Sequence, residues 1–277
     1  MNLKKQKLFF SLLLILVAIK LPVFSLNLDV STLLTIFSLL FAILLGFFIA
    51  TATTNYLRLQ SLIAEEDSSL IILFNLVRKI EPQSVGKVIN AIDNYAIAAL
   101  SFEAEDYVDK TRYEFENFTK EIDAINFSDK NGEELFSSLH GKKNELYRVR
   151  QEIALVARRI VTSAHWVVII SLGILVGFLT LTLRHGELLS GVISGILLAS
   201  DYLLLTLLYE VDNNRFLEQA LSYQNSQQIF EAIGRPPYYL ADTIKSGRIS
   251  KPNKSYRTGY YKSFKDNDIK LVDIVKK

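Results

Sequence analysis

Residues 33–51 read LLTIFSLLFAILLGFFIAT, a run without a single charged side chain. A helix of about 20 apolar residues crosses the hydrocarbon core of a bilayer. Three more stretches of comparable length and apolar character occur, at residues 8–26, 166–183 and 188–209. Half of all residues are hydrophobic and the mean hydropathy is +0.23. The sequence therefore predicts an all-α integral membrane protein with four transmembrane helices.

The first stretch permits two interpretations. Lys4, Lys5 and Lys7 precede an apolar run, as in a secretory signal peptide. However, Lys20 and Pro22 interrupt the run, and no small-x-small cleavage site follows. We favour an uncleaved membrane anchor, and a cleaved signal peptide remains the alternative.

Basic residues predict how the four segments are threaded, because loops rich in Lys and Arg stay on the cytoplasmic side. The loop over residues 27–31 has no Lys or Arg, and the loop over residues 184–187 has only Arg184. Every basic cluster lies in the other parts of the chain: Lys4, Lys5, Lys7, Arg58, Arg148, Arg150, Arg158, Arg159, Arg215 and Arg235. We therefore expect a multi-pass protein of the plasma (inner) membrane with both termini in the cytoplasm.

This threading divides the chain into four regions. Residues 1–51 hold transmembrane helices one and two, and residues 164–209 hold helices three and four. Residues 52–163 form a helical cytoplasmic domain, which we expect to be built on extensions of helices two and three because apolar positions recur there at helical spacing. Residues 210–277 form a cytoplasmic C-terminal segment that we expect to be weakly ordered after about residue 245, because it is rich in polar and charged residues.

Small residues recur at intervals of four in three of the transmembrane segments, and such spacing lets helix backbones approach closely in lipid. The pattern does not say which helices pair, or whether they pair within one subunit or between subunits. The candidate packing residues are Ala42, Gly46, Ala50, Gly173, Gly177, Gly191 and Gly195.

Four residues are candidates for an ion pathway. Phe41, Phe47 and Phe48 could form a hydrophobic constriction if several subunits contribute them to a ring, although phenylalanines that face lipid or the core are the commoner case. Asp201 is the acidic residue deep inside a segment, where a carboxylate is costly and suggests a function. Its alternatives are a hydrogen bond to a neighbouring helix or a pair with a basic residue such as Lys20.

An acidic cluster follows the second segment and contains Glu65 and Glu66. The helix that leads to the third segment carries Arg150 and Arg158. If the two helices are antiparallel neighbours, these charges would pair, which we favour over the alternative that the acidic cluster binds a cation.

Other classes of function have little support. The formal net charge is only +2, so nucleic acid is not an expected partner. There is no cysteine, and the three histidines are far apart, so neither a metal site nor a cofactor is expected. No phosphate-binding loop, dinucleotide fingerprint or catalytic triad order is present. We therefore do not expect an enzyme.

Several short features together carry a family resemblance. Arg58 is followed by Glu65-Glu66, Tyr95 lies in the next helix, the stretch from Arg150 to Arg159 enters the third segment, and EVDNNRF at residues 210–216 follows the fourth. With two segments on each side of a helical insert, residues 30–240 resemble the bestrophin-like bacterial membrane proteins. The resemblance implies an oligomeric anion channel whose second helix lines the pore.

Two functional hypotheses follow. The first is a homo-oligomeric ion channel or permeation pore, with the lipid bilayer and permeating ions as its partners. The second is a membrane-anchored scaffold or sensor whose cytoplasmic helices bind a partner, since these parts hold more than half of the chain. The sequence does not specify the ion, the gating stimulus or the number of subunits.

Overall fold

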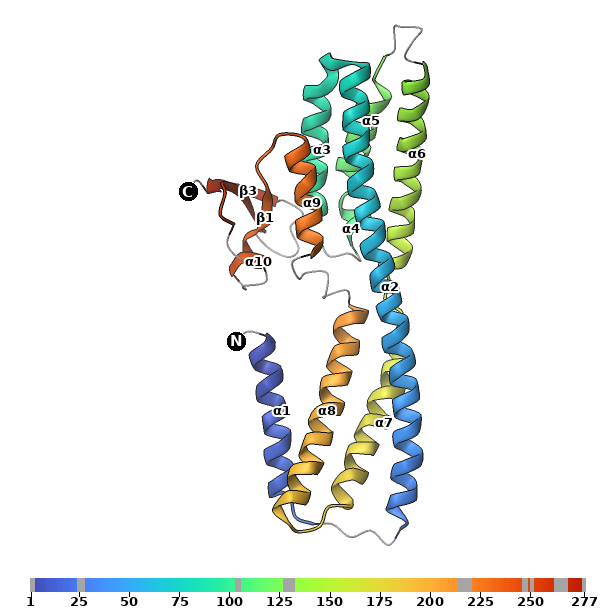
Figure 1. Ribbon diagram of the computed structural model, residues 1–277, viewed down its shortest axis with the longest axis vertical. Helices are drawn as coiled ribbons and strands as arrows, with labels where there is room; N and C mark the ends of the chain where they lie inside the picture. The colour runs from blue at the N-terminus through green and yellow to red at the C-terminus, as the bar shows by residue number, and fades with distance from the viewer. Residues whose placement is uncertain are drawn as a thin grey trace. The chain divides into compact units, whose positions relative to one another are not determined.

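The computed structural model describes residues 3–23, 28–102, 106–126, 133–213, 221–245, 249, 252–261 and 269–275. The chain divides into two compact units. Figure 1 shows their helices and strands. The first unit comprises Met1–Thr54 and Arg159–Arg215, and the second comprises Asn55–Arg158 and Phe216–Lys277.

Four helical segments form the first unit. They are α1 (Leu3–Lys20), the N-terminal part of α2 (Val30–Ile80), α7 (Ser163–Thr182) and α8 (Leu188–Asp212). Three helices, α2, α7 and α8, are long and apolar enough to cross a membrane. The 18-residue helix α1 does not meet the same criterion because it includes Lys4, Lys5, Lys7 and Lys20. A fourth membrane crossing therefore stays a prediction.

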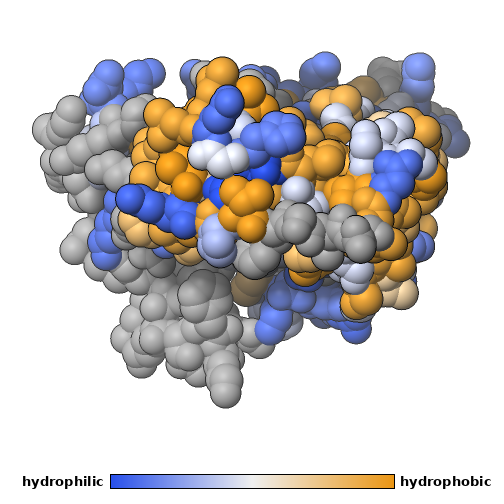
Figure 2. All heavy atoms as spheres, turned by 90° about the horizontal axis from the view of Figure 1, so that it is seen from below, coloured by the Kyte–Doolittle hydropathy of each residue, from blue (hydrophilic) through white to orange (hydrophobic). Residues whose placement is uncertain are grey.

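The first unit exposes large apolar side chains on each of these segments, as expected for helices solvated by lipid rather than water. Examples are Leu16 on α1, Ile43 on α2, Ile174 on α7 and Ile193 on α8, each at least half exposed. Figure 2 shows apolar residues over much of the face seen from below, broken by hydrophilic patches.

The second unit is a helical bundle around one apolar core. Its helices besides the C-terminal part of α2 are η1 (Pro82–Ser84), α3 (Val85–Ala99), α4 (Tyr107–Lys110), α5 (Arg112–Asp123), α6 (Glu133–Val156), α9 (Leu221–Ala232) and α10 (Ala241–Lys245). The core takes one apolar stripe from each long helix. Its fully buried members include Leu62, Ile92, Phe118, Leu146 and Phe230.

Helix α2 continues without interruption through both units, as expected from the apolar spacing. It has 51 residues and ends at Ile80, directly before Glu81-Pro82. Proline cannot continue a helix and restricts the residue before it. The sequence therefore predicted the extension of this helix correctly, and Glu81-Pro82 explains its end.

The corresponding extension of the third apolar segment is absent, which corrects the expectation of one long helix. Helix α6 ends at Val156, and α7 begins at Ser163. Asn55 caps the end of α6 by donating from Nδ2 to the carbonyl oxygen of Val156 at 2.6 Å. Thr162 caps the start of α7, where its side chain accepts from the backbone N–H of His165.

Asp212, at the end of α8, stabilises the non-helical segment between α6 and α7. Its Oδ1 accepts hydrogen bonds from the backbone N–H groups of Ile160 and Val161, both at 3.0 Å. These donors would otherwise lack partners, because the chain is not helical there. Side-chain capping by a residue far away in the chain leaves no periodic pattern in the sequence, so this break could not be predicted.

The all-α class is confirmed, with one small addition. Strands β1 (Tyr238–Leu240), β2 (Tyr256–Tyr261) and β3 (Ile269–Val275) form a sheet in that order, with a parallel and then an antiparallel pair. Arg257 on β2 forms a two-pronged ion pair with Asp93 of α3, with both contacts at 2.7 Å. The expected weak order after residue 245 stays a prediction.

Candidate functional site

One face of α2 in the first unit packs inward. Phe41, Leu45 and Phe48 are buried on this face. A Cβ added to Gly173 of α7 would lie 3.3 Å from Cε2 of Phe41, and the ring of His165 lies 4.9 Å from that of Phe48. Of the three candidate constriction residues, Phe41 and Phe48 therefore contribute to helix packing within the protomer.

The small residues of α2 lie on the outside. Ala42, Gly46 and Ala50 are exposed, and a Cβ added to Gly46 would meet nothing within 4 Å. This stripe therefore lies on the exposed side of α2.

A bulky stripe lies beside it on the outside. Leu39, Ile43 and Phe47 are spaced by four and are 60%, 60% and 63% exposed. Residues four apart lie above one another on one helix face. Sequence reasoning selected Phe47 but missed Leu39 and Ile43, although the spacing of four that selected the small residues would also have grouped these three.

The glycines of α8 and α7 make close contacts within the first unit. A Cβ added to Gly191 would lie 3.3 Å from Cα of Ile19, and one added to Gly195 would lie 2.7 Å from Cα of Ile15, both on α1. A Cβ added to Gly177 of α7 would lie 2.8 Å from Cδ2 of Leu198 on α8. The structure thus pairs α8 with α1 through its glycine face, which the sequence could not specify.

Arg184, in the loop between α7 and α8, has a local structural role. Its two terminal nitrogens donate to the carbonyl oxygens of Ala18 and Leu21 at the end of α1. The last carbonyls of a helix lack partners within the helix, and a cation there also favours the helix dipole. The guanidinium is buried and caps α1.

Asp201 is partly exposed on α8. Within the part of the chain that the structure describes, it forms no ion pair, and Lys20 forms none either. Whether Asp201 serves an ion pathway stays a prediction.

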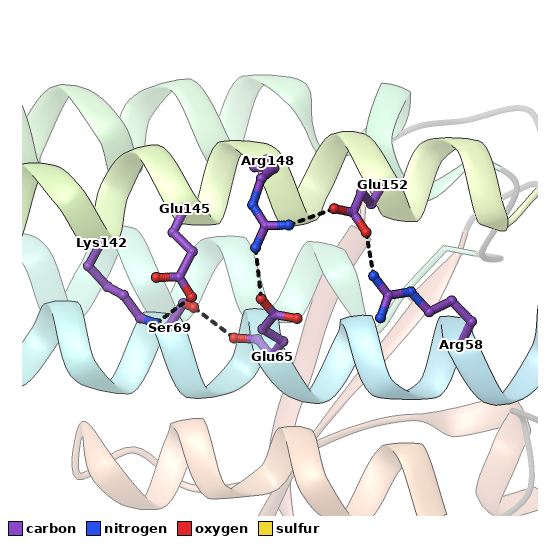
Figure 3. A network of polar contacts seen from close by, with 7 residues as sticks. All are labelled: Arg58, Glu65, Ser69, Lys142, Glu145, Arg148 and Glu152. Atoms are coloured by element: carbon purple, nitrogen blue, oxygen red, sulfur yellow. Dashed lines mark hydrogen bonds and ion pairs between the residues drawn. The ribbon is translucent and has the colours of Figure 1, made fainter.

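Charged side chains link α2 to α6 in the second unit (Figure 3). Arg58 donates to Glu152 at 2.6 Å, and Arg148 donates to Glu152 at 2.7 Å and to Glu65 at 3.3 Å. These contacts are exposed, so each contributes only about 0 to 1 kcal/mol. The partner of Glu65 is Arg148, whereas Arg158 is exposed and pairs with none of the described acidic residues.

A buried polar centre lies behind this surface. Tyr95 of α3 and Tyr107 of α4 each donate a hydrogen bond to one carboxylate oxygen of Glu66 on α2. Arg150 of α6 donates to the hydroxyl of Tyr95 at 2.6 Å, and to Val108 and Thr111 at 2.6 and 2.8 Å. Glu66 and Arg150 therefore meet through Tyr95, which the sequence reading had not linked to either charge.

The electrostatics of this centre follow from burial. Removal from water raises the pKa of Glu66, and the hydroxyls of Tyr107 and Tyr95 and the charge of Arg150 partly oppose that rise. Arg150 also lies over the ring of Phe115, with 4.4 Å from its Cζ to the ring centre. The centre joins four helices, α2, α3, α4 and α6, through hydrogen bonds.

Asp67 adjoins this centre. Its Oδ2 accepts from Oγ of Ser226 on α9 at 2.8 Å. Burial, with a smaller contribution from the charge of Glu66, raises the pKa of Asp67 to about 8. Among the described residues no group of His, Asp or Glu side chains could hold a metal ion.

Comparison with known proteins identifies the fold. The model of the Bestrophin-like domain matches residues 10–213. A structure of a bacterial bestrophin homologue from Klebsiella pneumoniae superimposes with a TM-score of 0.60 and 13% identity, covering 83% of this chain and 98% of that one. A variant of that homologue with the mutation I180T gives a TM-score of 0.61 and 14% identity over 82% and 97%. At such identity the likeness shows the fold alone. No match was found among the curated proteins.

Proposed function

Because this chain belongs to the Bestrophin-like domain family, whose model spans residues 10–213, we propose that it is a channel-type membrane protein and not an enzyme. In this proposal several copies surround a symmetry axis, and the stripe of Leu39, Ile43 and Phe47 on α2 lines the ion pathway.

The observation that carries the proposal is the division of α2 into two faces. Phe41, Leu45 and Phe48 are buried within the protomer, whereas Leu39, Ile43 and Phe47 extend outward at a spacing of four. Lipid would cover an outward stripe on a monomer. A ring of identical subunits instead turns such a stripe into a hydrophobic constriction, which controls permeation by excluding water.

The oligomer is supported by the small residues beside that stripe. Ala42, Gly46 and Ala50 are exposed, and a Cβ added to Gly46 would meet nothing within 4 Å. Small residues at this spacing let a second helix approach closely, since association in lipid depends on packing. Closed rotational symmetry would place a copy of α2 at each such contact.

Orientation follows from the basic residues. In the proposed threading both termini and the second unit are in the cytoplasm, and the protein resides in the plasma (inner) membrane. Arg184, the basic residue of an outer loop, is buried as the cap of α1 and so does not oppose this threading.

The test is ion flux through purified protein in liposomes, with chloride and sodium measured separately because the resemblance implied an anion channel. We expect flux above that of empty liposomes, and we expect Phe47→Ala to raise the basal flux several-fold by widening the constriction. Phe178→Ala is the matched control, since Phe178 of α7 is also exposed, at 49%.

Two results would contradict the proposal. One is the absence of flux of either ion over a broad range of voltage. The other is an equal effect of Phe47→Ala and Phe178→Ala, which would place Phe47 against lipid. A non-conducting protein that purifies from its native membrane with a stoichiometric soluble partner would instead indicate a membrane-anchored scaffold.

A further inference from the structure

A concavity of about 570 Å³ lies on the second unit, away from the buried polar centre. The start of α3 and its preceding turn form one wall, with Gln83, Lys87 and Asn90. The segment that follows α9 forms the other, with Ile233 and Arg235. Small-molecule sites typically enclose about 300 to 1,000 Å³, so this volume would fit one small ligand.

The lining is cationic. Lys87 and Arg235 both line the concavity, and no acidic side chain does. Within the residues that the structure describes, neither cation forms an ion pair. Two positive charges therefore face one hollow without a compensating carboxylate, which favours an anionic occupant.

The arginine is held in position. Its Nη2 donates to Oδ1 of Asn90 at 2.6 Å, which fixes the guanidinium across the concavity. Its backbone N–H donates to the carbonyl oxygen of Phe230 at 2.8 Å. Gly234 has a φ of 71°, a conformation that glycine adopts without strain, and so the turn after α9 can bring Arg235 to this wall. An anchored guanidinium loses less freedom when it binds a ligand.

We propose that this concavity binds a phosphate-bearing anion. The remaining N–H groups of Arg235 match the paired oxygens of a phosphate, Lys87 supplies a second charge, and the amides of Gln83 and Asn90 supply neutral donors. Ile89 and Ile233 line the same hollow and would contact an apolar part of the ligand. A soluble nucleotide and an anionic lipid headgroup share this chemistry.

The test uses the full chain in a neutral detergent. Pyrophosphate, ATP and a short-chain phosphatidylglycerol below its micellar concentration are titrated separately by calorimetry. We expect saturable binding of at least one probe, and we expect Lys87→Ala and Arg235→Ala each to weaken it about tenfold or more, since hydrogen bonds to charged groups contribute about 1.5 to 3 kcal/mol. Lys79→Ala is the matched control, because Lys79 is exposed at the end of α2 and lies outside the concavity.

The outcomes distinguish a soluble phosphate ligand from a lipid headgroup, and they show whether the proposed site exists. Tighter binding of pyrophosphate or ATP would identify a soluble phosphate ligand, and tighter binding of phosphatidylglycerol would identify a lipid headgroup. Arg235→Lys keeps the positive charge but loses the paired N–H donors of the guanidinium. This variant should bind the probe more weakly than the unchanged protein while retaining its thermal midpoint. The proposal is overturned if no probe binds at millimolar concentration, or if Lys79→Ala weakens binding as much as Lys87→Ala.

Discussion

Glu65 and Glu66 are neighbours in the chain, but they lie in different environments on α2. Glu65 is partly exposed and meets Arg148 at the surface, whereas Glu66 is 3% exposed and accepts from two tyrosines. The helical repeat causes the difference, because Glu66 lies four residues after the buried Leu62 and four before the buried Leu70. The same pattern separates Arg148 from Arg150 on α6.

The pair on α6 allows a matched prediction. Arg150→Met should destabilise the protein by about 3 kcal/mol or more, since it removes one member of a buried charged network and leaves Glu66 uncompensated. Arg148→Met should cost less than about 1 kcal/mol, because the side chain of Arg148 is 58% exposed. Denaturant unfolding in detergent measures both, and equal losses would show that burial does not distinguish the two arginines.

Asp67 gives a prediction about pH. Its pKa is about 8 in the folded protein, against about 3.9 in an unfolded chain, so the folded state binds the proton more tightly between these values. Stability contributed by Asp67 is therefore fully present below about pH 4 and is lost as the pH rises to about 8. Asp67→Asn should flatten that decline in thermal midpoint. A residual decline is expected from Glu66, whose pKa is also raised.

The control for this prediction is Asp109→Asn. The side chain of Asp109 is 81% exposed, so this substitution should leave the pH profile unchanged. An Asp67→Asn profile that overlays the original between pH 5 and 8 would show that Asp67 does not bind a proton in this range.

For single residues, the sequence contained a further signal, which concerns the burial of Glu66 and Arg150. Glu66 and Arg150 interrupt apolar stripes at buried positions, which predicts a buried pair rather than a surface one. Their link through Tyr95 and Tyr107 could not be predicted, because it depends on how α3 and α4 pack against α2. The exposure of Arg158 follows from the end of α6 at Val156, and no breaker residue marks that end.

Among the elements, α1 is attached to α8 and to the loop before α8 by three different interactions. The glycine face of α8 contacts its backbone, Arg184 caps its C-terminal end, and Lys7 pairs with Glu210 of α8 at 2.5 Å. Each of these acts at a different level of the helix. These contacts hold α1 in the first unit, and its retention as an uncleaved anchor stays a prediction.

Gly195→Ala tests this attachment. A Cβ at Gly195 would lie 2.7 Å from Cα of Ile15, so the backbones of α1 and α8 must move apart, and the thermal midpoint should fall by several degrees. Gly46→Ala adds the same methyl group where nothing lies within 4 Å, and it should not lower the stability of the protomer. If Gly195→Ala is neutral, the close approach of these helices is wrong.

Helix positions could be predicted from the sequence, whereas the contacts between helices could not. Spacing along one helix is local information, and it located the apolar segments, the extension of α2 and the small-residue faces. The pairing of α1 with α8 and the break before α7 depend on contacts between distant residues, such as Asp212 with Ile160. Strand β2 reads YRTGYY and lacks alternation of apolar and polar residues, so its pairing also gave no periodic signal.

For the whole molecule, the channel proposal requires that the second unit lies on the opposite side of the membrane from the loop between α1 and α2. Among the described residues three helices are long and apolar enough to span, so the chain would cross three times if α1 does not cross and four times if it does. Its four lysines are compatible with crossing because they lie at its two ends, where long side chains can reach the interface. Crossing by α1 therefore determines the side of the N-terminus, whereas crossing by α2 determines the side of the second unit.

Labelling of single cysteines decides on which side of the membrane the second unit lies, and the chain has no native cysteine to interfere. Ser31→Cys lies at the start of α2, and Ser138→Cys lies on α6; both serines are exposed. If α2 crosses the membrane with its N-terminal end outside, an impermeant maleimide added to intact cells should label Ser31→Cys and spare Ser138→Cys. Both should react after permeabilisation, which confirms that each thiol is accessible. Labelling of Ser138→Cys in intact cells would place the second unit outside, where neither the basic loops nor a cytoplasmic ligand for Lys87 and Arg235 would fit.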